Sequence, residues 1–320
     1  MKHRNLILVS GLLILVLAGF AALQHYRYAL YDAAMSMEAS RAGLTKGHIT
    51  VDGIDWAYYR GPEHPGAETV VMIHGFAAYK ENWLRYARYF TDRYNVIAPD
   101  LPGHGETSSP LDLDYSIETQ AGRVKAFLDA LGVKQAHLVG NSMGGAISAV
   151  FGAQWPERTL TLTLIDPAGV FDAPSLLDQE LAAGRNPLIV KEPSDFGRLL
   201  DFALEKKPFI PWPISQVAAE KSMARKTVND KIFHDISRER PRIRDFKEGL
   251  KLIRAPTLIL WGDQDRVINV KNGEIFDQLI PNSKLVVMKG IGHAPMIEVP
   301  EEAARLTLDW IAQATSAQKP

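Results

Sequence analysis

Residues 136–145 read Ala-His-Leu-Val-Gly-Asn-Ser-Met-Gly-Gly, and the architecture can be worked out from this stretch. Its first four residues are typical of a short strand, and a helical pattern runs from Met143 to Gln154. Between them stands a G-x-S-x-G motif, in the strand-to-helix context that a nucleophile elbow requires. Side chains at the glycine positions would collide in so sharp a turn, which lifts the hydroxyl of Ser142 above the sheet at a helix N-terminus. We expect Ser142 to be a nucleophile, and the simpler alternative is a serine that caps the helix.

Short apolar runs alternate with helical stretches on both sides of this motif. Expected strands cover residues 69–73, 95–98, 136–139, 161–165, 257–261 and 284–288, after a hairpin at 47–61. Expected helices cover residues 116–131, 143–154 and 301–312. Strands that are apolar throughout and separated by helices indicate an α/β fold with a mostly parallel sheet covered on both faces.

One long segment interrupts the alternation. Residues 171–254 contain helical stretches, several prolines and the apolar cluster Phe209-Ile210-Pro211-Trp212, but no convincing strand. An insertion at this point lies at the carboxyl edge of the sheet, where sites form in α/β proteins. We therefore expect a core made of residues 46–170 and 255–320, with residues 171–254 as a helical cap over a pocket. The apolar cluster could contact lipid, line an acyl pocket or pack as a core loop.

A nucleophilic serine needs a base, and His293 is the best placed of nine histidines. It lies in the loop Gly290-Ile291-Gly292-His293-Ala294-Pro295, between the last expected strand and the last expected helix. Glycines before it and a proline after it favour an accessible loop position over a core position. A surface or buried structural histidine is the alternative.

The base in turn needs a carboxylate that orients it and stabilises the imidazolium. The segment Trp261-Gly262-Asp263-Gln264-Asp265 follows a strand and offers two candidates. We favour Asp265, because it lies further into the loop, and assign Asp263 to holding the turn. Asp166, at the end of the strand 161–165, is a rival acid, or else caps its own loop. The order Ser, Asp, His differs from that of the two common serine protease classes.

An acyl-transfer site also holds an oxyanion. The expected donors are the backbone N–H groups of Met143, which follows the nucleophile, and of Phe76, in the loop after the strand 69–73. His74 and His104 are interpreted as structural, since the chain already offers a better base. The sequence contains no H-E-x-x-H, Walker A or G-x-G-x-x-G motif, so neither a metal nor a nucleotide cofactor is expected.

The N-terminus departs from the rest of the chain. Residues 6–23 form an uncharged run of 18 residues, about 27 Å long as a helix, which is close to the hydrocarbon thickness of a bilayer. Basic residues 2–4 precede it, so the positive-inside rule places the N-terminus in the cytoplasm and the rest outside. We expect residues 1–45 to form an inner-membrane, single-pass anchor and a juxtamembrane helix. A cleaved signal peptide is the alternative.

Composition narrows the function classes further. The chain has 320 residues, 46% of them hydrophobic, a formal net charge of −1 and no cysteine. The charge gives no general attraction to nucleic acid or anionic lipid, and the lack of cysteine excludes disulfides and thiolate metal sites. Membrane contact would therefore depend on the apolar run.

With these motifs in place, the chain resembles serine hydrolases of the α/β-hydrolase superfamily. The motifs are HGF at 74–76, DLPGHG at 100–105, GNSMGG at 140–145, WGDQD at 261–265 and GHAPMIEVP at 292–300. IDPAG at 165–169, NPLIVKEPSD at 186–195 and the N-terminal run are similar to two groups within it. These are the bacterial family V lipases, with the membrane-anchored phospholipase A type of pseudomonads, and the animal membrane-anchored monoacylglycerol lipase.

The resemblance implies an enzyme that cleaves acyl esters of glycerolipids, with a cap that shapes the acyl pocket. It also implies homodimers through the membrane segment, where Ala18 and Ala22 form a small-xxx-small pair of a kind common in alanine-rich segments. GNSMGG also resembles hydrolases of C–C bonds in ring-cleavage products, which carry a different loop after HG. A soluble-substrate carboxylesterase or C–C hydrolase is therefore the alternative, and a binding protein on an inactive hydrolase fold is the third.

Overall fold

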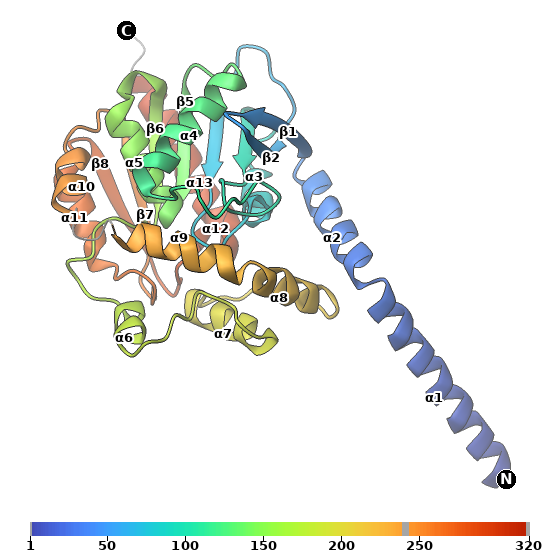
Figure 1. Ribbon diagram of the computed structural model, residues 1–320. Coiled ribbons are helices and arrows are strands. Elements are labelled where there is room, and N and C mark those ends of the chain that lie inside the picture. The colour runs from blue at the N-terminus through green and yellow to red at the C-terminus, as the bar shows by residue number, and fades with distance from the viewer. Residues whose placement is uncertain (1, 239–242, 318–320) are drawn as a thin grey trace.

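The computed structural model describes residues 2–238 and 243–317, apart from the side chains of residues 2–8, 11, 14, 15, 243 and 317. Within them, eight strands form one sheet in the order β1-β2-β4-β3-β5-β6-β7-β8 (Figure 1). The strands are β1 (Thr45–Val51), β2 (Ile54–Arg60), β3 (Thr69–Ile73), β4 (Asn95–Pro99), β5 (Ala136–Asn141), β6 (Thr159–Ile165), β7 (Thr257–Gly262) and β8 (Ser283–Met288). β1 and β2 pair antiparallel, β2 pairs antiparallel with β4, and the remaining pairs are parallel. The expected hairpin and mostly parallel sheet are confirmed.

Helices cover both faces of this sheet, as its apolar strands require. Those of the core are α3 (Leu84–Ala87), α4 (Ile117–Ala130), α5 (Met143–Gln154), α11 (Lys271–Leu279), α12 (Pro295–Glu298) and α13 (Pro300–Ala317), with short 3₁₀ helices η1 (Lys80–Trp83) and η2 (Pro156–Arg158). One buried cluster lies under α4, α5 and α11, and the other under α3, α12 and α13. The sequence analysis did not predict α11, which is only nine residues long.

Between β6 and β7 the described residues form five helices: α6 (Leu176–Ala182), α7 (Pro193–Ala203), α8 (Ile214–Ala224), α9 (Lys226–Arg238) and α10 (Ile243–Leu250). The described residues of this segment form no strand. In Figure 1 these helices lie beyond the end of the sheet toward which β7 points and partly beside it. They therefore occupy the side of the sheet on which loops after parallel strands meet.

The N-terminal segment forms two helices, α1 (Lys2–His25) and α2 (Arg27–Arg41). The expected membrane span at residues 6–23 falls in α1, and some of its side chains lie outside the described part. No helix of the described residues is both long enough and apolar enough to cross a membrane. The juxtamembrane helix expected after it corresponds to α2, which packs on α8 through the ion pair of Arg27 with Glu220 at 3.3 Å.

Candidate active site

Ser142 occupies a strained turn between β5 and α5. Its backbone angles are φ 55° and ψ −118°, a region that residues with a side chain seldom adopt. The conformation is held from both sides, because the amide of Ser142 donates to Ile165 O and its carbonyl accepts from the amide of Ala168, each at 2.9 Å. The Ser142 side chain makes no capping hydrogen bond to the helix. Its hydroxyl therefore does not cap the start of α5, which removes the simpler N-cap interpretation.

The glycines on either side of Ser142 are required by close backbone approach. A Cβ at Gly144 would lie 2.1 Å from the carbonyl oxygen of Ile73, and one at Gly140 would lie 2.3 Å from the carbonyl oxygen of Gly144. Both contacts are with backbone atoms, which cannot move aside as the end of a flexible side chain can. The steric explanation given for the motif therefore holds at these two positions.

His293 and Asp265 meet at the carboxyl end of β7. The ring Nδ1 of His293 lies 2.8 Å from Oδ2 of Asp265, and both side chains are almost completely buried. The other carboxylate oxygen, Oδ1, accepts from the amides of Val267 and Ile268 at 2.8 and 3.0 Å, and Oδ2 also accepts from the indole of Trp261. Donors on all sides make this carboxylate an acceptor, so Nδ1 of His293 carries the proton and Nε2 is left as the basic nitrogen.

The loop of His293 is attached directly to the turn of Ser142. The side-chain amide of Asn141, the residue before the serine, donates to His293 O at 3.1 Å and to Ile165 O at 3.2 Å. Glu298 fixes the same loop from the other side by accepting from the amide of Gly292 at 2.9 Å. The sequence analysis assigned no role to Asn141 or Glu298. The bond of Asn141 to His293 spans 152 residues and leaves no local pattern in the sequence.

The two expected oxyanion donors lie on elements next to Ser142. Met143 is the first residue of α5, so its N–H is among those at a helix start that have no partner within the helix. Phe76 stands in the loop after β3, where a Cβ on the preceding Gly75 would lie 3.1 Å from Ser142 Cβ. Ala77 follows with φ 55°, so this loop also holds a conformation that needs support from its surroundings.

That support comes from a buried ion cluster that the sequence analysis did not predict. Lys80 is 1% exposed; its backbone N–H donates to Oδ1 of Asp100 at 2.8 Å and its ammonium to Oδ2 at 2.7 Å. Glu106 accepts from the same ammonium at 2.9 Å and from Lys46 at 2.7 Å. Removing a single partner from such a cluster leaves an uncompensated buried charge, which is strongly destabilising. Through the backbone and side chain of Lys80, the cluster anchors the end of the loop that carries Phe76.

The cluster makes stability depend on pH. Burial opposes ionisation of Glu106, but its hydrogen bonds to Lys46 and Lys80 outweigh that effect and lower its pKa from 4.5 to about 2. A carboxylate with a lowered pKa stabilises the fold above its unfolded pKa, and the contribution is lost as pH falls from about 4.5 toward 2. We expect the melting temperature of Glu106→Gln to fall less than that of the wild type over this range, measured by circular dichroism. Glu63→Gln, on an exposed pair with Arg60, is the matched control, and equal pH dependence of all three proteins would contradict the expectation.

His74 and His104 lie in the core beside this loop, fully buried and in edge-to-face contact. Nε2 of His74 accepts from the amide of Leu101 at 3.0 Å, so Nδ1 is the donor to Gly75 O at 2.8 Å. Burial lowers the pKa of both rings, most strongly for His104, and keeps them neutral. Their contacts are those of structural residues.

Asp166, the rival acid, accepts from the amide of Gly262 at 2.8 Å through Oδ1. Asp265 rather than Asp166 is thus the hydrogen-bonded partner of the imidazole. Among the described residues, Asp166, Asp265 and His293 form one group with ligand atoms within 4.8 Å of one another, a spacing that a metal could use. Nδ1 of His293 already donates to Asp265, however, so this nitrogen carries a proton and is not available to a metal. Asp263 accepts from the amide of Gly290 at 2.7 Å and holds the turn between β7 and the histidine loop.

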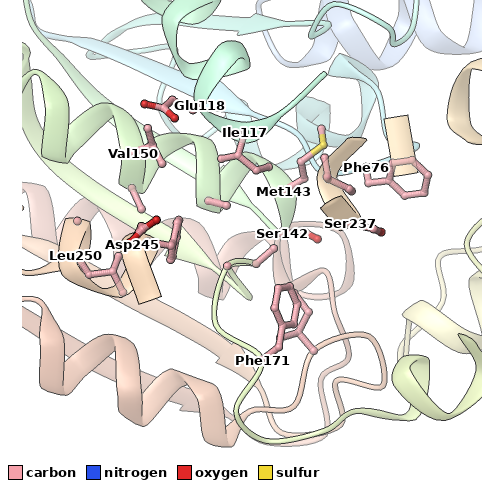
Figure 2. Close-up of a pocket in the computed structure, with 18 of the residues that line it drawn as sticks. Phe76, Ile117, Glu118, Ser142, Met143, Val150, Phe171, Ser237, Asp245 and Leu250 are labelled. Atoms are coloured by element: carbon pink, nitrogen blue, oxygen red, sulfur yellow. The ribbon is translucent and has the colours of Figure 1, made fainter. Parts of the chain in front are cut away.

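A cavity of about 380 Å³ opens beside Ser142 (Figure 2). Figure 2 shows Ser142 near its middle, with Phe76 on one side and Leu250 and Asp245 on the other. The cavity follows α5 from Met143 to Gln154 and is closed by α9, α10 and the segment around Phe171. Its walls are mainly apolar: Phe76, Ile117, Met143, Ala146, Ala149, Val150, Ala153, Phe171, Leu188, Phe233, Phe246 and Leu250.

Known proteins are similar to this chain in sequence and in architecture. The chain is 33% identical over 273 residues to "Lipase 1" of Psychrobacter immobilis, covering 83% of this chain and 84% of that protein. It is 32% identical to "Monoacylglycerol lipase ABHD6" of Mus musculus, covering 79% of this chain and 78% of that protein. The solved structure of a membrane phospholipase A, described as a bacterial virulence factor, is similar with a TM-score of 0.88 and 40% identity, over 98% of this chain and 99% of that one.

Residues 68–300 match a family described as the alpha/beta hydrolase fold. This range includes Ser142, Asp265, His293 and all of the segment between β6 and β7. The relatives cover most of both chains, so the likeness is not confined to the motifs. The chain belongs to the α/β-hydrolase fold family and resembles its bacterial lipases, monoacylglycerol lipases and membrane phospholipase A.

Proposed function

We propose that this protein is a membrane-anchored serine hydrolase that cleaves acyl esters of glycerolipids through Ser142, His293 and Asp265. That it is a carboxylic ester hydrolase follows from its family and its relatives. The observation that carries the finer proposal is the strained turn of Ser142 in the wall of a mainly apolar cavity, tied through Asn141 to the loop of the His293–Asp265 pair. An apolar cavity with few polar groups is the type of site that suits an acyl chain.

The arrangement supports a two-step acyl transfer. Ser142 attacks the ester carbonyl while Nε2 of His293 takes its proton, and Asp265 holds the ring and stabilises the imidazolium. The N–H groups of Met143 and Phe76 would donate to the oxyanion of the tetrahedral intermediate. His293 then returns the proton to the departing alcohol or lysolipid, and a water molecule, activated by the same base, releases the fatty acid.

The cavity provides space for the acyl group along α5. From Ser142 to Ala153 the helix advances about 16 Å, so the lining is long enough for an extended acyl chain. Ala146, Ala149 and Ala153 have small side chains, which leave space along this wall. Glu118 and Asp245 line the far end. In this proposal residues 171–254 are the cap, because α9 and α10 close the cavity, while residues 46–170 and 255–320 form the core.

The substrate class can be tested with a panel of esters. We expect hydrolysis of monoacylglycerol, lysophospholipid or diacyl phospholipid, and a preference for medium over short p-nitrophenyl esters, because each buried methylene contributes about 0.8 kcal/mol. Initial rates would be measured with wild-type protein and with Ser142→Ala as the blank. Activity restricted to short water-soluble esters, or cleavage of a ring-opened C–C substrate in preference to every ester, would contradict the glycerolipid proposal.

Attachment to the inner membrane through residues 6–23, with the catalytic domain on the periplasmic side, is also part of the proposal. Its supports are the uncharged run itself, the exposed apolar side chains of α1 and the stacking of Phe20 on Trp212 at 5.0 Å, next to the exposed Phe209. In the membrane, two chains would associate through α1, where the small residues Ala18 and Ala22 allow the two helices to approach closely.

Fractionation of cells tests this attachment. We expect the full-length protein in the inner-membrane fraction, released by detergent but not by high salt, because apolar contact is not screened by ions. N-terminal sequencing of the protein in that fraction should give a sequence that starts at Met1 or at the residue after it. A mature protein that begins between Ala18 and Ala22 and is found in the periplasm would show a cleaved signal peptide instead.

A further inference from the structure

Asp166 is a buried carboxyl group that the proposed reaction does not use. It directly follows β6, the strand between β5, which leads to Ser142, and β7, which leads to Asp265. Its backbone has φ 44°, and its amide donates to Leu260 O at 2.9 Å. Side-chain Oδ1 accepts from the amide of Gly262, whereas Oδ2 is buried without a hydrogen-bond partner among the described residues. A fully buried oxygen without a partner is costly, so this one calls for an explanation.

The carboxyl group of Asp166 lies beside the proposed triad. Carboxylate oxygens of Asp166 and Asp265 and a ring nitrogen of His293 are all within 4.8 Å of one another. Two carboxyl groups that share a buried site do not readily ionise together. The number of donors decides which one holds the charge: Asp265 accepts two backbone amides, an indole and the imidazole, whereas Asp166 accepts one amide.

The surroundings of Asp166 favour its neutral form. Burial raises the pKa of Asp166 well above its ordinary range, the charge of Asp265 raises it further, the amide of Gly262 opposes the effect, and Glu298 adds to it. His293 is the basic group that faces the same space. These surroundings favour a neutral Asp166, with burial as the largest cause and the negative charge of Asp265 as the second.

We propose that Asp166 is a reserve acid, a positioning residue that remains neutral while Asp265 is ionised and becomes the counter-ion of His293 when that charge is removed. The inference rests on the proposed function of His293 as the base. On ionisation the proton of Asp166 passes to solvent, and no other bond forms or breaks. A purely structural Asp166, which only holds the turn at Gly262, is the competing explanation.

Four proteins separate the two explanations: wild type, Asp166→Asn, Asp265→Ala and the double variant. Asparagine at 166 keeps the size of the side chain and the acceptor for Gly262, and cannot ionise. Alanine at 265 frees the amides of Val267 and Ile268 and leaves polar space in which a water molecule can connect Asp166 to His293. Asparagine at 265 is unsuitable here, because its own amide would donate to Nδ1 of His293.

The first readout is kcat/KM for one ester at neutral pH. We expect Asp166→Asn to remain within about threefold of wild type, since a neutral group replaces a neutral group. Asp265→Ala should keep at least about tenfold more activity than the double variant. This factor corresponds to a change of about one unit in the pKa of His293, caused by the charge of Asp166. Equal activity of Asp265→Ala and the double variant would overturn the proposal. So would a loss in Asp166→Asn as large as that in Asp265→Ala, because Asp166 would then be the primary partner.

The second readout is the acid limb of the pH profile, which a structural role would not move. A negative charge near His293 stabilises the imidazolium, so the limb of Asp265→Ala should lie at higher pH than that of the double variant. If the double variant does not fold, Asp265→Ala alone decides. Its limb should lie within about one pH unit of wild type when Asp166 ionises, and a larger downward shift contradicts the proposal.

Failure of the proposed function itself gives a different result. If His293 and Asp265 do not act as base and partner, Asp265→Ala hydrolyses the ester as fast as wild type, with an unchanged acid limb. The proposal about Asp166 fails alone when Asp265→Ala is impaired but the double variant is no worse. Melting temperatures of all four proteins show whether any loss comes from unfolding.

Discussion

Replacement of Ser142 by alanine is expected to lower kcat for ester hydrolysis by about 10⁶, the loss typical of a serine nucleophile that works with a histidine base. The residual rate reflects binding and oxyanion stabilisation without an acyl-enzyme. KM should change little, because the walls of the apolar cavity are untouched. The measurement is the initial rate on a medium-chain p-nitrophenyl ester at saturating concentration.

Ser148→Ala is the matched control for this substitution. Ser148 is buried in the same helix, and its hydroxyl donates to the carbonyl of Gly144 at 2.7 Å, away from the cavity lining. We expect this variant to retain nearly all activity, with a small loss of stability. Ester hydrolysis by purified Ser142→Ala at the wild-type rate would show that another residue is the nucleophile.

Replacement of Asp265 by asparagine is expected to lower kcat by about 10⁴ without loss of the fold. The amides of Val267 and Ile268 would hold the side-chain oxygen of the asparagine, as they now hold Oδ1 of Asp265. The NH₂ group would then point at Nδ1 of His293 and force the proton onto Nε2. A histidine in that tautomer cannot accept the proton of Ser142.

Asp263→Asn is the control, since Asp263 stands two residues away on the same loop and accepts only the amide of Gly290 among the described residues. Asparagine retains that acceptor, so kcat should stay within a few-fold of wild type. Steady-state rates and melting temperatures would be measured for both variants. A large loss in Asp263→Asn with little change in Asp265→Asn would reverse the assignment made from the sequence.

Much of the fold could be predicted because its signals are local. The strand, turn and helix around Ser142 are encoded within about 20 residues, by periodicity and by glycines whose added Cβ atoms would meet backbone. The end of β7 likewise identifies the loop that carries Asp265. Family membership then followed from motifs that are each short but occur in a fixed order. The catalytic roles of these residues remain predictions, which the substitutions at Ser142 and Asp265 test.

Other features depend on contacts between distant parts of the chain. The burial of Lys80 against Asp100 and the bond from Asn141 to His293 join segments separated by 20 or more residues. The burial of Asp166 Oδ2 without a partner likewise results from tertiary packing. No periodicity or spacing distinguishes these side chains from ordinary polar residues. The shape of the cavity beside Ser142 is unpredictable for the same reason, because residues of α5, α9 and α10 line it together.

The central claim is that Ser142 forms a covalent acyl-enzyme, and a serine-directed fluorophosphonate tests it most directly. The wild-type protein would be incubated with the reagent, and the intact mass and the modified peptide would be determined by mass spectrometry. Our account predicts one adduct per chain, on Ser142, with loss of ester hydrolysis in proportion to labelling and no adduct on Ser142→Ala. Full labelling of another residue, or undiminished hydrolysis by protein fully labelled at Ser142, would contradict it.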